Sequence, residues 1–216
     1  MSAEKVGAGK EGAKKAEAHR PLSGEGAIQL KSTTDPRWLP QALEQFDAVL
    51  IDHAHCEKKA AANALSILQA HPEVPGLPAH MARLAREESG HLARVLKLMD
   101  ERGLVLGRDN GDPYAQKLQT LVRKTQPERR LDRLLVAAVI EARSCERLAL
   151  LAGGLPPGPL KRFYAELAQS EDGHQELFFR LACQAHGEQE ARARVEVILT
   201  REAEIVAEIG IRPAIH

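Results

Sequence analysis

The chain contains few aromatic residues, few cysteines and no long apolar run, and each shortage argues against a class of protein. Only 3% of its residues are Phe, Trp or Tyr, which suits a helical core of Leu, Ala and Val. Its three cysteines, Cys56, Cys145 and Cys183, lie far apart and form no CxxC pair. This pattern is typical of a reducing, cytoplasmic compartment and offers neither a disulfide framework nor a thiolate metal site. No apolar run approaches about 18 residues, and the first residues lack the apolar core of a secretory signal, so we expect no membrane association.

The chain also lacks an excess of charge of either sign. Its 30 basic residues balance 30 acidic ones, so any nucleic-acid surface must come from local clusters. A length of 216 residues suffices for one well-filled domain. Residues 1–27 are rich in Lys, Glu, Gly and Ala, with Val6 and Leu22 as their large aliphatic residues. We therefore expect a disordered N-terminal tail over 1–27 and a single domain over 28–216.

Apolar residues recur at steps of three and four along most of the domain, which predicts long helices. The expected helices cover about 37–70, 77–102, 128–153 and 158–186, with a further, more charged helix after Gly187 that packs on the outside. Proline and glycine at 71–76 and 153–159 predict tight turns, whereas 103–127 is a longer connection with a short helical stretch. This order predicts an all-α, ferritin-like four-helix bundle with a long central crossover and an additional C-terminal helix.

Two Glu-x-x-His runs interrupt the apolar stripes of the second and fourth long helices. Residues three apart share a helix face, so each Glu and its His project together. A further glutamate lies one long helix upstream of each run. The six candidate metal ligands are Glu57, Glu88, His91, Glu141, Glu171 and His174. Four carboxylates would repel one another in a core, whereas two divalent cations would balance them, so we expect a di-metal site in the bundle.

Neighbouring acidic residues compete for two of these positions. Glu87 lies about 100° round the helix from Glu88, so helical phase favours Glu88 and leaves Glu87 beside the site or in solvent. Glu146 lies off the stripe of Glu141, but its Cys-Glu context resembles that of Glu57, and it stays an alternative.

Other residues close to the candidate ligands have simpler expected roles. His53 and His55 flank the ligand stripe of the first long helix without ligand spacing, so we expect hydrogen-bonded structural histidines. Asp172 and Arg143 adjoin ligands and could orient them, although surface salt bridges are the expected role of both.

Basic residues gather in the crossover and at the start of the third long helix. As candidate contacts to nucleic-acid phosphates we take Lys117, Arg123, Lys124, Arg129, Arg130 and Arg133. A solvated helical face with interspersed acids would explain the same cluster. Tyr114 could stack on a base or pack in the core.

Several runs resemble the MiaE family of tRNA hydroxylases, over roughly residues 28–212. The most specific is Glu141-Ala-Arg-Ser-Cys-Glu-Arg147. Similar runs are Ile51-Asp-His-Ala-His-Cys-Glu-Lys-Lys-Ala-Ala61, Arg86-Glu-Glu-Ser-Gly-His91, Asp112-Pro-Tyr114 and Ser170-Glu-Asp-Gly-His174.

The resemblance implies a non-haem di-iron monooxygenase with two iron ions held by the same six residues and dioxygen as co-substrate. The implied reaction hydroxylates the isopentenyl group of 2-methylthio-N6-isopentenyladenosine at position 37 in a tRNA anticodon stem-loop. Electrons would come from an external reductase, because the chain has no flavin or nicotinamide fingerprint and no iron–sulfur cysteine set. The alternatives are a ferritin- or rubrerythrin-like ferroxidase or peroxide scavenger, although the CxxC pairs of rubrerythrin are missing, and a helical binding module with an incidental metal site.

Overall fold

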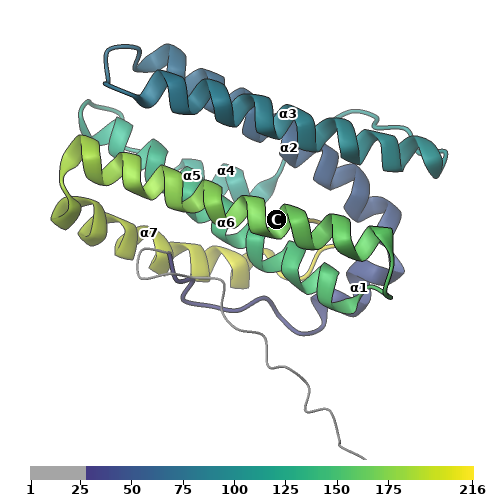
Figure 1. The fold of residues 1–216 in the computed structure, drawn as a ribbon. Coiled ribbons are helices and arrows are strands. Elements are labelled where there is room, and N and C mark those ends of the chain that lie inside the picture. Colours follow the sequence, from purple (N-terminus) through teal and green to yellow (C-terminus); the bar gives the residue numbers. More distant parts are fainter. Residues whose placement is uncertain (1–27) are drawn as a thin grey trace, which may run out of the picture.

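Two antiparallel helix pairs form the centre of the computed structural model, which describes residues 28–216 (Figure 1). One pair is α2 (Phe46–Ala70) with α3 (Leu77–Glu101), and the other is α5 (Glu128–Gly154) with α6 (Pro159–His186). The helices of each pair pack along their whole length, and the two pairs face each other. Residues 28–216 contain helices and no strand, so the predicted ferritin-like bundle is confirmed. The predicted tail lies outside the described residues.

The first long helix was expected to be continuous, and this expectation is wrong. The chain forms α1 (Trp38–Glu44), leaves the helical conformation at Gln45 and restarts as α2. The break lets Trp38 turn into the core, where its indole N–H donates to the carbonyl of Ala214 at 3.1 Å. The spacing of apolar residues in the sequence continues through this break, so it could not reveal that the helix is interrupted.

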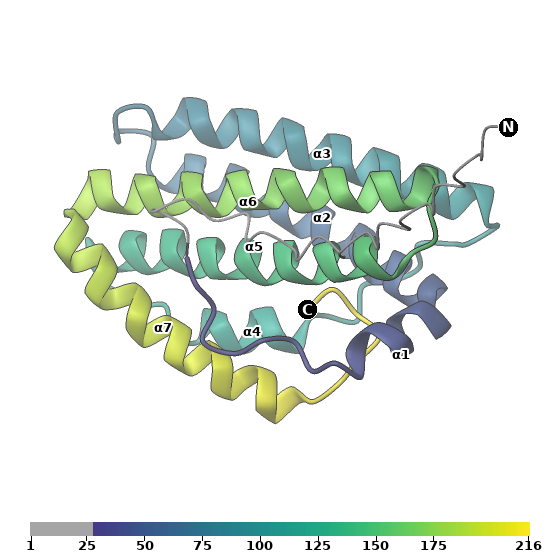
Figure 2. The ribbon, with the colours of Figure 1, turned by 60° about the horizontal axis from the view of Figure 1, so that its bottom comes forward.

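The crossover and the last helix cover one side of the α5–α6 pair (Figure 2). α4 (Pro113–Gln119) begins at Asp112, whose side chain accepts hydrogen bonds from the amides of Tyr114 and Ala115. α7 (Glu188–Ile209) packs on α4, α5 and α6, so the predicted outer packing role is confirmed. Beyond α7 the chain turns back to the bundle between α1 and α4, where Ile215 and His216 are buried.

A buried ion pair fastens α7 to the bundle. Arg143 is fully buried on α5, and its guanidinium lies 2.7 Å from Glu202 of α7. The same guanidinium pairs with Glu146. The expected surface salt bridge of Arg143 is therefore wrong, because α7 covers this face of α5. Among the described residues no helix is both long and apolar enough to cross a membrane.

Candidate metal centre

The six predicted ligands come together between the two helix pairs. α2 supplies Glu57 and α5 supplies Glu141, while α3 and α6 each supply one Glu-x-x-His pair. All four carboxylates are buried, from fully enclosed Glu88 to Glu141 at 7% exposure. Four of the groups, Glu57, Glu88, His91 and Glu171, place one ligand atom each within 4.8 Å of the others. This group comes from α2, α3 and α6, while Glu141 of α5 and His174 lie beside it, in contact with its carboxylates.

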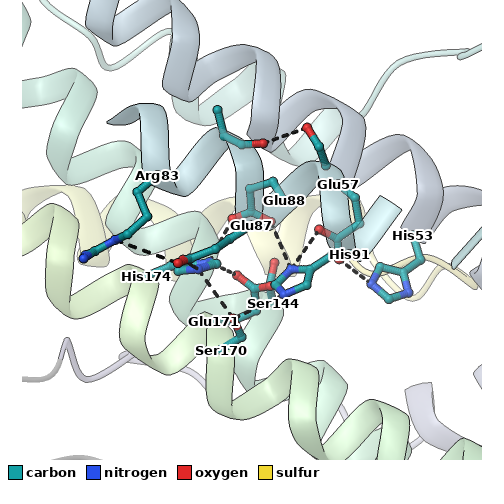
Figure 3. Close-up of polar contacts among 12 residues, drawn as sticks. His53, Glu57, Arg83, Glu87, Glu88, His91, Ser144, Ser170, Glu171 and His174 are labelled. Atoms are coloured by element: carbon teal, nitrogen blue, oxygen red, sulfur yellow. Dashed lines mark hydrogen bonds and ion pairs between the residues drawn. The ribbon is translucent and has the colours of Figure 1, made fainter. Parts of the chain in front are cut away.

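Both imidazoles turn the same ring atom towards the carboxylates (Figure 3). Nδ1 of His91 lies 3.3 Å from Glu88 and 3.5 Å from Glu171. Nδ1 of His174 lies 2.8 Å from Glu88 and 3.0 Å from Glu171. Each histidine therefore contacts the glutamate of its own helix and the glutamate of the opposite helix.

The competing acidic residues lie outside this centre. Glu146 accepts hydrogen bonds from the backbone and hydroxyl groups of Thr34 at 2.9 and 2.6 Å, on the side of α5 that faces away. Glu87 is partly exposed, and its carboxylate lies 3.4 Å from Nε2 of His174 and 3.8 Å from Arg83. Glu87 thus borders the centre, and Glu88 lies inside it.

The crowding of carboxylates changes the proton affinity of the histidines. Burial opposes protonation of His91, but hydrogen bonds to Glu171, Glu57 and Glu88 outweigh it and raise the pKa of His91 to about 12. At His174, burial is likewise outweighed by hydrogen bonds to Glu171 and Glu88, which raise its pKa to about 11. Protonated imidazoles thus hold the carboxylates together in the metal-free protein.

The carboxylates themselves carry too much negative charge for a buried site. Burial, together with the charge of Glu171, raises the pKa of Glu88 to about 7. Burial and the charges of Glu171 and Glu88 raise the pKa of Glu141 well above its ordinary value. Cations would replace these protons, and a set of carboxylate oxygens and imidazole nitrogens suits iron. The residues present therefore fit a di-metal centre.

Two neighbours that were not predicted to act on the ligands contact them directly. His53, which we expected to be structural, is buried and places Nε2 at 2.7 Å from Oε1 of Glu57. Ser170 Oγ lies 3.3 Å from Nε2 of His91 and 3.5 Å from Nε2 of His174. These contacts orient the ligands. Helical phase could have identified Ser170, which lies four residues before His174.

Metal binding is expected to release protons. The pKa values of about 12 and 11 leave both His91 and His174 protonated at pH 7, and each must lose its proton to offer a lone pair, so binding of two ferrous ions should release at least two protons per chain. Calorimetric titrations in buffers of different ionisation enthalpy measure this number. A binding enthalpy that is independent of the buffer would contradict the expected protonation.

A cavity of about 450 Å³ extends from the ligands between α2, α4 and α5. Its inner end is formed by Glu57, Glu88, Glu141 and Glu171, and its side walls are mainly apolar. Polar groups of Asp112, Ser144 and His216 form part of one wall, and exposed Gln116 and Gln119 lie on its rim. A small organic group could therefore reach the carboxylates from the surface of α4.

A basic groove, defined here by Arg123, Lys124, Arg129 and Arg133, adjoins this cavity. Gln119 lines both the groove and the cavity. Arg123 is paired with the buried carboxylate of Asp132 at 2.8 Å. Lys124 and Arg129 have no acidic partner within residues 28–216, so their charges are available to a ligand.

The other predicted RNA contacts are placed differently. Lys117 lies on α4 and pairs with Glu208 at 2.7 Å, and Arg130 lies 3.2 Å from His186. Tyr114 is 2% exposed and donates its hydroxyl to Glu202 at 3.0 Å. Its ring therefore packs in the core and is not available to stack on a base.

Comparison with known proteins gives consistent similarities. A family model described as tRNA-(MS[2]IO[6]A)-hydroxylase (MiaE) matches residues 25–216. The tRNA 2-(methylsulfanyl)-N(6)-isopentenyladenosine(37) hydroxylase of Pseudomonas putida is 40% identical over 173 residues, which cover 80% of this chain and 84% of that protein. The protein of the same name from Salmonella typhimurium is 35% identical over 126 residues, 58% of this chain and 46% of that protein.

A solved structure has a similar backbone. It is described as Protein 43 with aldehyde deformylating oxygenase activity from Synechococcus, and it is 38% identical with a TM-score of 0.82. The match covers 88% of this chain and 96% of that chain. The family model spans every described helix, including the four that carry the candidate ligands.

Proposed function

The chain belongs to the MiaE family of tRNA hydroxylases, and on this basis we propose that it is a non-haem di-iron monooxygenase. Its substrate is a tRNA anticodon stem-loop with 2-methylthio-N6-isopentenyladenosine at position 37, and its product carries a hydroxyl on the isopentenyl group. The enzyme works in the cytoplasm, where its substrate is found.

Two iron ions would be held by the six buried ligands, Glu57, Glu88, His91, Glu141, Glu171 and His174. When bound, iron supplies the reductive activation of dioxygen that hydroxylation of a C–H bond requires. The electrons come from a separate reductase, because three scattered cysteines cannot hold an iron–sulfur cluster.

The apolar part of the cavity suits the isopentenyl group. Its lining includes Ala60, Ala137, Ile140, Leu148 and Ile215. These side chains exclude water around an alkyl group and offer it no hydrogen bond, so they position it by shape. Exclusion of water also protects a reactive oxidant from side reactions.

The observation that carries the proposal is that the basic groove lies beside this cavity and shares a lining residue with it. Gln119 lies where the two meet. A nucleotide extruded from the anticodon loop could place its base in the cavity while Lys124 and Arg129 contact the phosphates outside. Neither a ferroxidase nor a peroxide scavenger needs an apolar cavity beside a groove of free cations.

Turnover of a defined RNA tests the proposal. The protein reconstituted with ferrous iron is incubated with the modified tRNA, dioxygen and a chemical reductant, and the nucleosides are analysed by mass spectrometry. We expect the isopentenyladenosine derivative to gain one oxygen atom, while tRNA that lacks the isopentenyl group stays unchanged. Failure of the modified nucleoside to gain oxygen would overturn the proposal. Parallel assays with peroxide and with a long-chain aldehyde detect a scavenger or a deformylating oxygenase.

A further inference from the structure

A buried chain of hydrogen bonds forms the polar part of the cavity wall, away from the metal ligands. Oδ2 of Asp112 lies 3.0 Å from Nδ1 of His216, and Nε2 of His216 lies 2.7 Å from Oγ of Ser144. All three residues are buried, and all three line the cavity. The ring of Tyr114 stacks on His216 with centroids 5.3 Å apart. The histidine is therefore held between fixed partners on both of its nitrogens.

The direction of these hydrogen bonds follows from Asp112. Burial opposes ionisation, but the hydrogen bond from His216, with smaller contributions from Lys59 and the amide of Ala115, outweighs it and lowers the pKa of Asp112 to about 2. The carboxylate can only accept, so Nδ1 of His216 must carry the hydrogen. With Nδ1–H directed at Asp112, the neutral tautomer has its lone pair at Nε2, where it accepts the hydrogen of the Ser144 hydroxyl. Ser144 is left with lone pairs alone to offer to the cavity.

The order Ser144–His216–Asp112 is also that of a hydrolase triad, but the surroundings do not suit nucleophilic catalysis. Ser144 lies in the interior of α5, whose backbone amides are used in the helix. A serine nucleophile needs free amides or other donors for the oxyanion that it creates.

A metal ion held by Cys56, Asp112 and His216 is an equally poor fit. Burial raises the pKa of the Cys56 thiol well above its ordinary value, so the sulfur keeps its proton. A thiol has to lose that proton before it can ligate a metal. Since the hydrogen-bond chain suits neither a nucleophile nor a metal ion, its effect is to orient the Ser144 hydroxyl. The hydroxyl donates to His216 and presents its oxygen lone pairs to the cavity.

The position of Ser144 relates this acceptor to the metal centre. Ser144 follows Glu141 by three residues, which is roughly 4.5 Å along the helix axis. The neighbouring α5 residues that line the cavity, Ala137, Ile140 and Leu148, are apolar. Apart from the candidate ligand Glu141, a substrate in this cavity therefore meets one polar acceptor on α5, about one turn from that carboxylate.

We propose that Ser144, held as an acceptor by His216 and Asp112, binds the N6–H group of the substrate adenine and so selects adenines with a single N6-alkyl group. This inference rests on the proposed function. An N6-alkyl adenine keeps one N6 hydrogen, and the reacting carbons of its isopentenyl group lie a few bonds beyond that nitrogen. A hydrogen bond at N6 thus leaves the alkyl group free to extend along the apolar wall towards the carboxylates.

Binding of two synthetic anticodon stem-loops to the iron-loaded protein without dioxygen tests this role. One stem-loop carries the N6-isopentenyl base, and the other carries an ether oxygen in place of the N6–H. Loss of one hydrogen bond is expected to weaken binding of the ether to the wild-type protein by about three- to tenfold. Ser144→Ala is expected to bind both stem-loops equally, and Ser144→Thr to restore the preference.

Control variants separate this role from structural damage. Ser89→Ala removes a hydroxyl that donates to the carbonyl of Ala85 on α3, and it should keep the wild-type preference. His216→Gln introduces an amide that can donate to Ser144, so it should reduce the preference. An unchanged preference in His216→Gln contradicts the role of the histidine.

Two further outcomes distinguish failure of the inference from failure of the proposed function. The inference alone is overturned if the wild-type protein hydroxylates the isopentenyl base but binds both stem-loops equally. It is also overturned if Ser144→Ala still prefers the N6-isopentenyl stem-loop over the ether. A wild-type protein that hydroxylates neither stem-loop and binds an unmodified one equally well overturns the proposed function.

Discussion

Glu171→Ala is expected to lose bound iron and to slow hydroxylation by at least about 100-fold. Loss of a residue that only supports a metal ligand lowers metal affinity or activity by about 10- to 100-fold. Glu171 lies inside the ligand cluster itself, so its loss should have a larger effect. Its carboxylate is 3% exposed and lies 3.0 Å from His174 and 3.5 Å from His91. Its removal would take one negative charge and two oxygen donors from the centre.

Iron per chain and the single-turnover rate with modified tRNA measure this effect together. Glu176→Ala is the matched control, because Glu176 is an exposed glutamate on the same helix. The control should bind as much iron as the wild-type protein and react at its rate. A Glu171→Ala protein with full iron content and full activity would show that the cluster is not the reactive centre.

Reversal of two charges in the basic groove is expected to weaken tRNA binding by at least about tenfold at low salt. Each phosphate contact contributes about 0.7 to 0.9 to the slope of log affinity against log salt concentration. One contact therefore changes the affinity by roughly threefold between 50 and 200 mM salt. Lys124→Glu with Arg129→Glu removes two of the groove cations that have no acidic partner within residues 28–216. The salt slope should therefore fall by about 1.5.

Binding titrations at several salt concentrations test this expectation. Arg180→Glu reverses an exposed charge on α6, outside the groove, and serves as the control. The groove variant should raise KM for tRNA and keep the iron content of the wild-type protein. An unchanged slope and affinity in the groove variant would place the RNA on another surface.

Helical periodicity was sufficient to predict the bundle and the composition of its centre. Glu88 and His91 must share a face if their helix is regular, and the same holds for Glu171 and His174. The choice of Glu141 over Glu146 followed from phase in the same way, and in the structure Glu146 faces Thr34 on the other side. Which of these residues bind metal stays a prediction until iron is measured in the variants.

The features that were missed depend on contacts between distant parts of the chain. His216 is 72 residues from Ser144 and 104 residues from Asp112, and no helical spacing relates a crossover residue to a segment beyond the last helix. The burial of Arg143 likewise depends on how α7 packs. Local patterns carry no information about either contact.

The most direct measurement is a single turnover of the iron-loaded protein with modified tRNA under isotopically labelled dioxygen. The account predicts that the isopentenyladenosine derivative gains one labelled oxygen atom in the wild-type protein and in Glu176→Ala, and none in Glu171→Ala. A product without the label, or an equal yield of labelled product from Glu171→Ala, would contradict hydroxylation at this centre.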